Sequence, residues 1–295
     1  PSTPELTTPN QEQLDIVNAI YEDKNIAVDA VAGSGKTTTV LWLAKKCKDK
    51  KILQVTYNAQ LKHEVREKVK KHKINNLEIH TYHSIATKFY DKKAYVDNII
   101  DEIIMFDKPP RRSTVLIDIL VIDETQDMTK RFYLLLNKYI IDSGSKPQLL
   151  ILGDRYQGIY TFKQADTRFL TLSNRLWDQT VSKLPLQTSF RVTKQIAWFV
   201  NTVMLGENRI TAPRSGPNVE IIRCNLFTDY NIIFKKLMGW IMSGEIKPDD
   251  IFVLAQSVKS SASACKVLEN KFVEAGIKCY APMADDKQID EDIIK

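Results

Sequence analysis

Short apolar runs alternate with segments of helical period along the first half of the chain. Runs of this length that are rich in β-branched residues predict strands, and the amphipathic segments between them predict helices. Because strands that alternate with helices form parallel sheets covered by those helices, the pattern predicts an α/β fold built on a parallel sheet. The expected strands are IAVDAV (26–31), KILQVT (51–56), LEIH (77–80), ILVID (119–123) and QLLILG (148–153).

A second series of the same kind begins near Leu184. Its expected elements are a helix at 193–204, an apolar run at 218–224, a helix containing FKKLMGWIM (234–242), an apolar run at 251–255 and a helix at 260–275. The segment TAPRSGPN (211–218), inside this series, contains Pro and Gly and predicts a long loop. With 295 residues, the chain is long enough for two domains.

The amino-acid composition indicates which class of protein this is, but it says little about the protein's function. The chain has 43% hydrophobic and 26% charged residues, as expected for a globular protein. Its net charge of +6 is compatible with a polyanionic partner, although lysine-rich proteins also reach this charge without one. The four cysteines are scattered without a CxxC pair, which argues against a zinc knuckle or a disulfide scaffold and favours an intracellular setting. The longest apolar run, 115–123, is too short to span a bilayer, so we expect no membrane partner.

The stretch DAVAGSGKTTT (29–39) carries the first chemical signal. It matches the phosphate-loop (P-loop) pattern G-x-x-x-x-G-K-S/T, except that Ala30 stands at the first glycine position. Glycines in such a loop let the backbone N–H groups face phosphate oxygens, at a helix N-terminus that favours anions. In this pattern Lys36 reaches the β- and γ-phosphates and Thr37 holds Mg²⁺. The residues expected around the nucleotide are Ala32, Gly33, Ser34, Gly35, Lys36, Thr37 and Thr38.

Two carboxylates follow the fourth expected strand, in ILVIDETQDM (119–128). Asp123 falls at the C-terminal edge of the sheet, where it can hold Mg²⁺ through water. Glu124 is then free to orient or deprotonate an attacking water. Acidic residues after a strand are also common turn formers, but their position downstream of GSGKT favours the hydrolytic interpretation.

These motifs resemble those of the superfamily 1 helicases, in particular the UvrD/PcrA-like group. DETQD (123–127) matches the DExxD form of that family's Mg²⁺ motif, and AVAGSGKT (30–37) matches its usual loop, in which alanine is the normal first residue. Further stretches match in order: TYNAQLKHEV (56–65), TYHS (81–84), LGDRYQGIYTFKQA (152–165), LQTSFRV (186–192) and DDIFVLAQS (249–257). The resemblance implies an α/β P-loop NTPase that uses ATP and Mg²⁺. It implies a RecA-like parallel sheet flanked by helices at 1–185 and a partial second RecA-like domain at 186–295.

The resemblance adds residues that the P-loop pattern does not name. It implies that Gln157 contacts the γ-phosphate and couples hydrolysis to the nucleic-acid site. It also implies that Arg191 supplies positive charge to the γ-phosphate in the manner of an arginine finger, and that Phe190 stacks on adenine. The predicted catalytic residues are then Lys36, Asp123, Glu124, Gln157 and Arg191, with Thr37 and Asp123 holding Mg²⁺.

The segment TTPNQEQ (7–13) offers two glutamines for reading the adenine, Gln11 and Gln13. We prefer Gln11 for this role. Gln11 also fits a capping box that begins at Thr8 and has Pro9 at the first helical position. The two roles are compatible with each other.

The resemblance also implies contacts with a single strand from Tyr57, Asn58, His83, Tyr160 and Phe162. Aromatic faces suit this task because every base can stack on them. Core packing is the alternative for Tyr57 and Phe162, and TYN is one residue shorter than the family's TFTN. The basic run 62–73 is more typical of a solvated helix face than of a binding site. His80 and His83 make a weak metal pair, because no carboxylate or cysteine accompanies them.

Two family features are absent from the chain. Fewer than forty residues separate TYHS from ILVIDE, where UvrD-like enzymes insert an accessory domain. We therefore expect a vestigial insertion at about 88–114, with one helix in YVDNIIDEIIMF (95–106). The chain also ends before the family's last two motifs, so we expect an incomplete second domain and slow ATP hydrolysis.

The sequence therefore predicts the core of an ATP-dependent DNA helicase or translocase. By resemblance it acts on single-stranded DNA and moves 3′ to 5′. An RNA-directed helicase of the same superfamily is the alternative, since no residue is identified as a reader of the 2′-hydroxyl group. A different class of protein is also compatible with these motifs: a nucleotide-gated nucleic-acid-binding subunit of a larger repair or replication assembly, without efficient turnover.

Overall fold

The computed structural model describes residues 6–159, 164–225, 229–255 and 263–279. They form two compact units, the first made of described residues up to Val219 and the second beginning at Glu220. No helix within these ranges is both long and apolar enough to cross a membrane.

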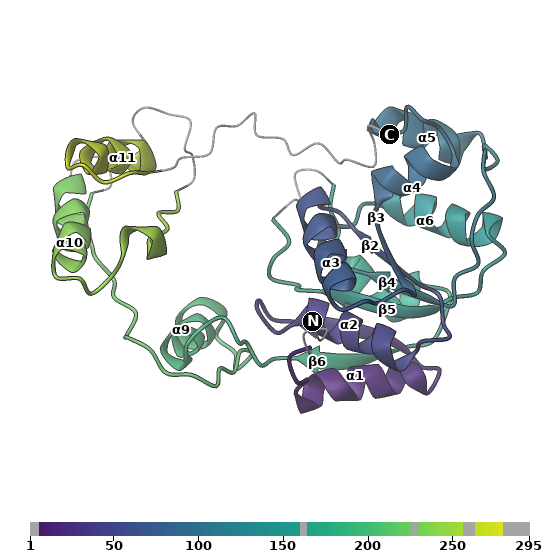
Figure 1. Ribbon diagram of the computed structural model, residues 1–295, viewed down its shortest axis with the longest axis horizontal. Helices are drawn as coiled ribbons and strands as arrows, with labels where there is room; N and C mark the ends of the chain where they lie inside the picture. Colours follow the sequence, from purple (N-terminus) through teal and green to yellow (C-terminus); the bar gives the residue numbers. More distant parts are fainter. Residues whose placement is uncertain (1–5, 160–163, 226–228, 256–262, 280–295) are drawn as a thin grey trace. The chain divides into compact units, whose positions relative to one another are not determined.

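The first unit is built on a six-stranded sheet in which every neighbouring pair of strands is parallel (Figure 1). The strand order is β3-β2-β4-β5-β1-β6. The five strands expected from the apolar runs are all present, which confirms the predicted α/β class and its parallel sheet. The strands are β1 (Asn25–Ala30), β2 (Ile52–Thr56), β3 (Leu77–Thr81), β4 (Ile119–Ile122), β5 (Gln148–Gly153) and β6 (Val181–Leu186).

The two strands β2 and β4 lie side by side inside the sheet and are buried along their whole length. Helices cover the sheet on both faces, so side chains that point either way need to be apolar. This is why these strands read as continuous apolar runs instead of alternating patterns.

One face of the sheet is covered by α1 (Gln11–Tyr21), α2 (Lys36–Lys46) and α3 (Ala59–Lys71). Apolar side chains of these helices share one buried cluster with strand residues such as Val28 and Val121. The predicted basic helix is therefore α3, which packs its apolar side on the sheet.

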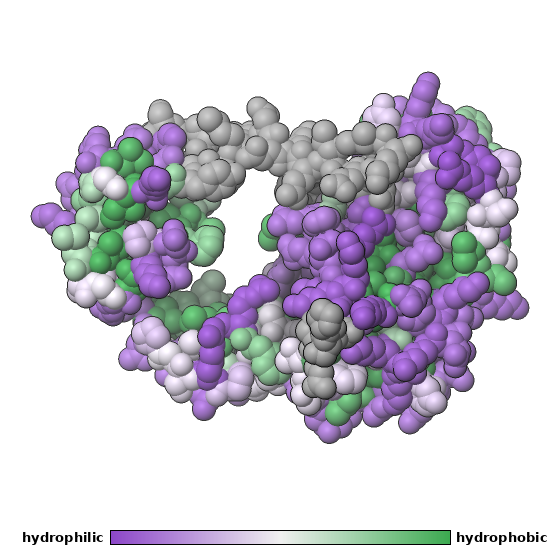
Figure 2. All heavy atoms as spheres, viewed as in Figure 1, coloured by the Kyte–Doolittle hydropathy of each residue, from purple (hydrophilic) through white to green (hydrophobic). Residues whose placement is uncertain are grey.

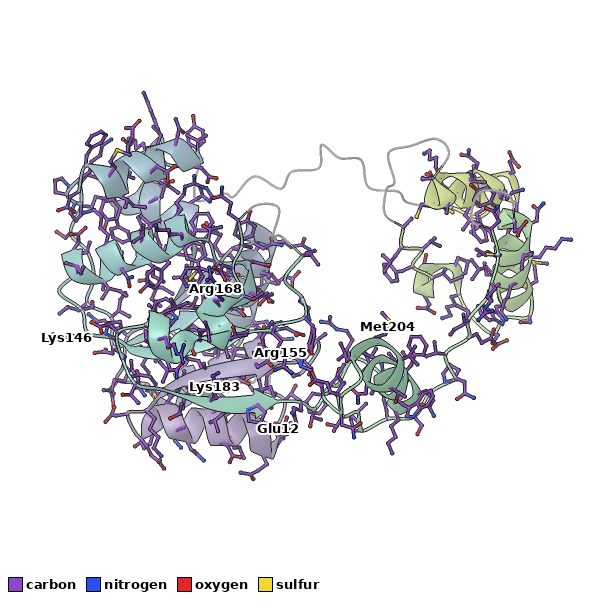
Figure 3. The ribbon with its side chains drawn as sticks, turned by 180° about the vertical axis from the view of Figure 1, so that it is seen from behind. Glu12, Lys146, Arg155, Arg168, Lys183 and Met204 are labelled. Carbon is purple, nitrogen blue, oxygen red and sulfur yellow. The ribbon has the colours of Figure 1, made fainter. Side chains whose placement is uncertain are left out.

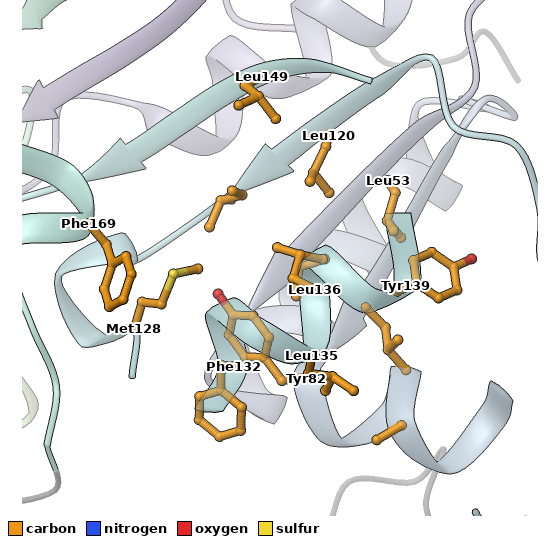
Figure 4. Close-up of a cluster of buried hydrophobic side chains, with 14 of the residues drawn as sticks. Leu53, Tyr82, Leu120, Met128, Phe132, Leu135, Leu136, Tyr139, Leu149 and Phe169 are labelled. Carbon is orange, nitrogen blue, oxygen red and sulfur yellow. The ribbon is translucent and has the colours of Figure 1, made fainter. Parts of the chain in front are cut away.

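The opposite face is covered by α4 (Tyr82–Phe89), α5 (Asp97–Met105) and α6 (Lys130–Asp142). Figure 4 shows the buried cluster between these helices and the strands. At its centre the rings of Tyr82 and Phe132 stack with their centroids 4.6 Å apart. The side chain of Phe132 therefore links α6 to α4.

The helix predicted at 95–106 is α5. Its residues Ile100 and Ile103 are fully buried in the same cluster, and α5 packs against α6. The short segment at the predicted insertion point therefore contributes to the core of the first unit.

The sixth strand, β6, was not predicted. Among the described strands it pairs with β1 alone and forms one edge of the sheet, and most of its residues are exposed or partly exposed. It also contains Lys183 and Pro185, which weaken the pattern of a strand but are tolerated at a sheet edge. Two short helices precede it, α7 (Arg168–Thr171) and α8 (Ser173–Leu176).

The predicted start of the first helix was wrong by two residues. The helix begins at Gln11, and Asn10 is its N-cap. The Asn10 side chain accepts a hydrogen bond from Gln13 N, and the Gln13 side chain accepts one from Asn10 N. Asn caps a helix at least as well as Thr, so the box starts at Asn10 and leaves Thr8 and Pro9 outside the helix.

After β6 the chain stays within the first unit for about thirty residues more, up to Val219. Helix α9 (Lys194–Phe199) continues into a π-helical segment, Val200–Leu205, and together they match the helix predicted at 193–204. The segment 211–218 is irregular, as predicted, and Thr211 pairs with Thr188 in an isolated bridge.

The second unit contains α10 (Tyr230–Met242), a 3₁₀ turn at Pro248–Asp250 and α11 (Ala264–Glu274). The strands expected from the apolar runs at 218–224 and 251–255 are not formed. An isolated extended segment has no neighbour to take its backbone hydrogen bonds, so an apolar run alone does not make a strand. Figure 2 shows apolar side chains at the surface of this unit, and α10 has no buried residue among those described.

Candidate nucleotide-binding site

The predicted P-loop lies between β1 and α2, and two glycines shape it. Gly33 has φ 75° and Gly35, the N-cap of α2, has φ 85°. A Cβ atom on Gly35 would lie 2.3 Å from Gln13 Nε2, and one on Gly33 would lie 2.5 Å from Arg191 Cβ. The loop therefore requires glycine at both positions, for backbone conformation and for space.

Gln13, and not Gln11, reaches this loop. Gln13 is buried, and its Nε2 donates to Ser34 O at 3.0 Å and to Gly35 O at 3.4 Å. Gln11 is exposed and donates to Asp15 on the same helix. The capping box that fixes the start of α1 thus turns Gln13, and not Gln11, toward the loop.

The segment that follows β6 is hydrogen-bonded to the P-loop. Phe190 N donates to Gly33 O at 3.0 Å, and Ser189 Oγ donates to Ala32 O at 2.7 Å. The carboxylate of Glu12, which is labelled in Figure 3, accepts hydrogen bonds from the backbone N–H groups of Gln187 and Thr188. These bonds fix the chain from Gln187 to Phe190.

The side chains of this segment are less constrained than its backbone. Phe190 and Arg191 are both exposed. Among the described residues, no carboxylate pairs with the Arg191 guanidinium, although its Cβ lies directly beside Gly33. Arg191 therefore lies next to the loop with its charge unpaired within the part of the chain that the structure describes.

Lys36 is held by the second carboxylate of the DETQD motif. Its Nζ lies 2.9 Å from both carboxylate oxygens of Glu124. Burial favours a lower pKa for Lys36, but the charges of Asp123 and Glu124 outweigh burial and raise that pKa. Lys36 is therefore a permanent cation at this position.

Asp123 lies at the end of β4 and is almost completely buried. It accepts hydrogen bonds from Gln54 Nε2 at 3.0 Å and from Glu124 N at 2.9 Å. Burial raises its pKa to about 6, with the neighbouring charge of Glu124 acting in the same direction and Lys36 opposing it. A cation bound at this carboxylate would lower that pKa and stabilise the ionised form.

Asp127, the last residue of the DETQD motif, is in a similar position. Burial, and after it the charge of Glu124, raise its pKa to about 6. Its Oδ1 atom is buried without a hydrogen-bond partner among the described residues.

Gln126 connects this motif to the next strand. Its Nε2 donates to Glu124 at 2.8 Å, and its Oε1 accepts from Asp154 N at 3.0 Å. Glu124 itself has a left-handed backbone, with φ 51°. This conformation is strained for a residue with a Cβ and is found mainly where the surrounding contacts enforce it, as at functional sites.

Asp154, after β5, is the centre of a second group of contacts. It accepts hydrogen bonds from Gln157 Nε2 at 2.9 Å and from Arg209 at 3.1 Å. Arg209 is buried and also bonds to Asp29 at 2.7 Å. The predicted phosphate-contacting Gln157 thus lies in the same network as Gln126, which bridges to Glu124.

Other groups around the loop are suited to hold a nucleotide and its metal. The hydroxyl of Ser34 is buried and has no hydrogen-bond partner among the described residues, so it is free to bind a phosphate oxygen. Thr37 and Thr38 occupy the first turn of α2, directly after Lys36. Oxygen ligands such as the Thr37 hydroxyl and the Asp123 carboxylate are those that Mg²⁺ prefers.

Three of the predicted strand-contacting residues lie near the C-terminal ends of β2 and β3. Tyr57 and His83 both contact Phe132, with ring centroids at 5.9 and 5.4 Å and edge-on geometry. His83 also bonds to Asp97 at 2.9 Å. Asn58 caps α3 by accepting a hydrogen bond from Gln60 N. Tyr57 is half-buried and packs on the core, so the structure brings these residues together but gives Tyr57 a packing role as well.

The remaining nucleic-acid predictions, Tyr160 and Phe162, lie outside the described residues. The two histidines considered as a metal pair have separate partners: His80 lies near Ser84 and Glu78, and His83 bonds to Asp97. Within the part of the chain that the structure describes, no group of three potential metal ligands occurs.

The site contains residues that the sequence did not single out. Gln126 stands inside the DETQD motif, where its position could have drawn notice, but only the order of the strands shows that it bridges β4 and β5. Arg209 lies in no recognised motif, and its role emerges from its burial between Asp29 and Asp154.

Most of the first unit matches a known protein family. A family profile described as an AAA domain matches residues 13–163, just over half of the 295-residue chain. A search of curated protein sequences found no match. The profile match, the P-loop and the parallel sheet together confirm the predicted α/β P-loop fold.

Solved structures that are similar to this chain include three proteins described as helicases. The Pif1 helicase from Candida albicans is 17% identical, with a TM-score of 0.41, over 63% of this chain and 41% of that protein. The DUF1998 helicase MrfA bound to DNA is 14% identical, with a TM-score of 0.36, over 60% and 25%. The UvsW helicase from bacteriophage T4 is 10% identical, with a TM-score of 0.39, over 62% of each chain. The chain spans less than two thirds of the length of each of these proteins.

Proposed function

We propose that this chain, which belongs to the AAA domain family, is the ATP-hydrolysing core of a nucleic-acid helicase or translocase. The observation that carries the proposal is the pair formed by Lys36 and Glu124, which joins the P-loop to the carboxylate motif at the C-terminal edge of the sheet. A purely structural ion pair would need neither the two-glycine loop beside it nor the buried Asp123 behind it. A phosphate-hydrolysing site needs all three.

Residues 32–38 are assigned to the phosphates of ATP. Gly33 and Gly35 keep the loop open, and the buried Ser34 hydroxyl offers a hydrogen bond to an oxygen atom. Lys36 lies at the start of α2, where the helix dipole adds to its own charge. Gln13 donates hydrogen bonds to two carbonyl groups of the loop. We propose Gln13, in place of Gln11, as the residue closest to the adenine.

Thr37 and Asp123 are assigned to Mg²⁺. When bound, the ion neutralises charge on the β- and γ-phosphate oxygens. The Asp123 carboxylate is kept in position by Gln54 and by the backbone N–H of Glu124. It is therefore oriented before any cation binds.

Glu124 is assigned as the residue that orients the attacking water and accepts its proton. Phosphate oxygens would compete with Glu124 for Lys36, so nucleotide binding would release one carboxylate oxygen of Glu124 toward water. Gln126 would continue to hold the Glu124 carboxylate from the other side, through its bond at 2.8 Å. The strained backbone at Glu124 fixes the direction in which the carboxylate points.

Three further residues complete the proposed nucleotide site. Arg191 supplies a second cation to the γ-phosphate, and Phe190 stacks on the adenine. Gln157 contacts the γ-phosphate and couples hydrolysis to the nucleic-acid site. It is hydrogen-bonded to Asp154. The network from Glu124 through Gln126 to Asp154 offers a route of direct contacts between hydrolysis and the segment that carries Gln157.

The nucleic-acid partner is assigned as single-stranded DNA, with movement from 3′ to 5′. Tyr57, Asn58 and His83 would meet the strand where β2 and β3 end, together with Tyr160 and Phe162. Residues from 186 onward would then belong to a second RecA-like domain, whose first segment is the one bound to the P-loop. RNA is the alternative strand, and a larger repair or replication assembly is the proposed setting.

The function is tested by ATP hydrolysis with and without single-stranded DNA. We expect the wild-type chain to hydrolyse ATP slowly, Lys36→Ala to lose nucleotide affinity, and Glu124→Gln to keep that affinity while turnover falls further. Lys48→Ala is the matched control, because Lys48 is an exposed lysine with no ion-pair partner among the described residues. Equal ATP affinity in wild type and Lys36→Ala would contradict the assignment.

The same experiment separates the alternatives. A nucleotide-gated binding module would change its affinity for the strand with ATP but would show no turnover in either form. An RNA-directed enzyme would respond to RNA more strongly than to DNA of the same sequence.

A further inference from the structure

A large groove lies along the edge of the sheet formed by β3. It has a volume of about 980 Å³ and is lined by residues of α3, β3 and α4 and by the segment at Arg111 and Arg112. β1, which leads into the P-loop, is separated from β3 by three other strands. None of the described residues assigned to the nucleotide or to the single strand lines this groove.

The groove is strongly basic. Six of its lining residues are lysine or arginine, and Glu78 is its only acidic residue among those described. Glu78 has its own partners, since it contacts His80 and pairs with Lys88 at 3.7 Å. The basic lining residues are Arg66, Lys70, Lys88, Lys92, Arg111 and Arg112.

Three of these cations already serve the fold. Arg66 donates to Ile79 O at 2.6 Å, Arg111 donates to Thr87 O, and Lys88 pairs with Glu78. These contacts connect the segments that line the groove and stabilise its shape.

The other three cations have no such role. Lys70, Lys92 and Arg112 are exposed, and the described residues include no ion-pair or hydrogen-bond partner for their side chains. They come from three separate segments of the chain and meet only in the fold. Like charges gathered in this way repel one another, so the arrangement costs free energy unless a polyanion binds there.

We propose that this groove binds the phosphate backbone of nucleic acid as a second site, away from the nucleotide cleft. The proposal rests on the proposed function, which supplies the nucleic acid. The described lining residues include no aromatic side chain apart from the buried His80, so they offer no surface for stacking bases. Binding there would depend on charge and would not depend on sequence.

The test uses the full chain without nucleotide, so that it does not depend on hydrolysis. The groove variant is Lys70→Ala/Lys92→Ala/Arg112→Ala. The control variant, Lys48→Ala/Lys50→Ala/Lys146→Ala, removes the same charge at exposed lysines that do not line the groove. Affinity for a long single-stranded oligonucleotide, and for the same strand carrying a duplex arm, is measured as a function of salt concentration.

We expect the groove variant to lose about 100-fold in affinity near 0.1 M salt, and its salt slope to fall by about 2 for the single strand, as expected for three lost phosphate contacts. The control should lose much less. A charge-preserving variant, Lys70→Arg/Lys92→Arg/Arg112→Lys, should bind like wild type, which shows that charge is responsible and not damage to the fold. Melting temperatures of all variants check that each one is folded.

Two results would overturn the proposal. One is equal affinity and equal salt slope for the groove and control variants, which would leave the proposed motor function intact. The other is unchanged nucleic-acid binding together with lost binding to anionic phospholipid vesicles, which would assign the groove to a lipid surface. If the proposed function fails instead, ATP turnover is absent or unresponsive to nucleic acid in every variant, whatever the groove binds.

Discussion

Lys36 and Arg191 are both cations beside the same phosphate loop, yet the chain holds them in different ways. The Lys36 side chain is 15% exposed and bonds to both carboxylate oxygens of Glu124. Arg191 is exposed, and the described residues offer its guanidinium no carboxylate. Only the backbone of its segment is fixed, through Phe190 N and the side chain of Ser189.

The difference separates two tasks. A mostly buried and paired lysine defines the position of a phosphate before it binds, because its own geometry is already set. An exposed arginine on a docked backbone is free to move toward or away from that position when the segment shifts. Lys36 is therefore expected to control binding, and Arg191 is expected to control the rate of the chemical step.

The sharpest test of this comparison is Arg191→Ala. We expect turnover at saturating nucleic acid to fall about 10³- to 10⁵-fold, as for other arginines that stabilise charge on a transferred phosphoryl group. ATP affinity and the free energy of unfolding should change little, because the side chain is exposed. Arg175→Ala is the control, since Arg175 is another exposed arginine without an ion pair among the described residues. If Arg191→Ala lowered ATP affinity as much as it lowered turnover, Arg191 would control binding as Lys36 does, and the proposed division of roles would be wrong.

Glu124→Gln removes the proposed proton acceptor that is paired with Lys36, so ATP hydrolysis should slow. Removing a general base typically costs about 10²- to 10⁴-fold in rate. The substitution leaves Lys36 and the P-loop glycines in place, so ATP affinity should be retained. Turnover and nucleotide affinity are measured separately, and unchanged turnover would rule out Glu124 as the proton acceptor.

Gly33→Ala tests the docking of the Arg191 segment. Its φ of 75° disfavours alanine, and the new Cβ would lie 2.5 Å from Arg191 Cβ. Gly144→Ala is the matched control, because Gly144 has φ 64° but a Cβ added there would have no atom within 4 Å. We expect the backbone term of about 1 to 2 kcal/mol in both variants and a further ~1 to 3 kcal/mol in Gly33→Ala alone, from chemical denaturation. Equal losses of unfolding free energy in the two variants would mean that the Arg191 segment moves away from the new Cβ atom without a loss of stability.

The smallest expected effect is a dependence of stability on pH at Asp127. Burial raises its pKa to about 6 in the folded chain, above its value of 3.8 in the unfolded chain. Its contribution to stability is therefore complete below pH 3.8 and is lost as the pH rises through about 6. Asp127→Asn should gain stability relative to wild type between these pH values, as measured by urea unfolding. A difference between the two proteins that stays constant across this range would contradict the raised pKa.

The sequence predicted the inner strands of the sheet because their burial leaves a direct trace in composition. Residues of β2 and β4 face helices on both sides, and each strand reads as an apolar run. β6 was missed because an edge strand needs fewer apolar residues and tolerates Pro185 and Lys183. The runs at 218–224 and 251–255 were apolar enough to predict strands, but strand formation also needs a neighbour, which a local pattern does not report.

The same contrast applies to the candidate site. Gly33, Lys36, Asp123 and Glu124 were predicted because each motif is contiguous and its chemistry requires those residue types. The choice between Gln11 and Gln13 depended on where α1 begins, and the capping contact of Asn10 decides it. The position of Arg209 between Asp29 and Asp154 depends on three segments far apart in the chain, so no local pattern contains it.

Arg66 and Pro185 both affect how readily another chain can add a strand to the edges of the sheet. A sheet with two open edges invites another chain to add a strand, by offering free backbone carbonyl and N–H groups. On the β3 edge the carbonyl of Ile79 is already taken by the Arg66 guanidinium, through Nε and Nη2 at 3.1 and 2.6 Å. On the β6 edge Pro185 has no N–H to donate. Each edge of the sheet therefore lacks one of the backbone groups that an added strand would use, which disfavours growth into larger aggregates.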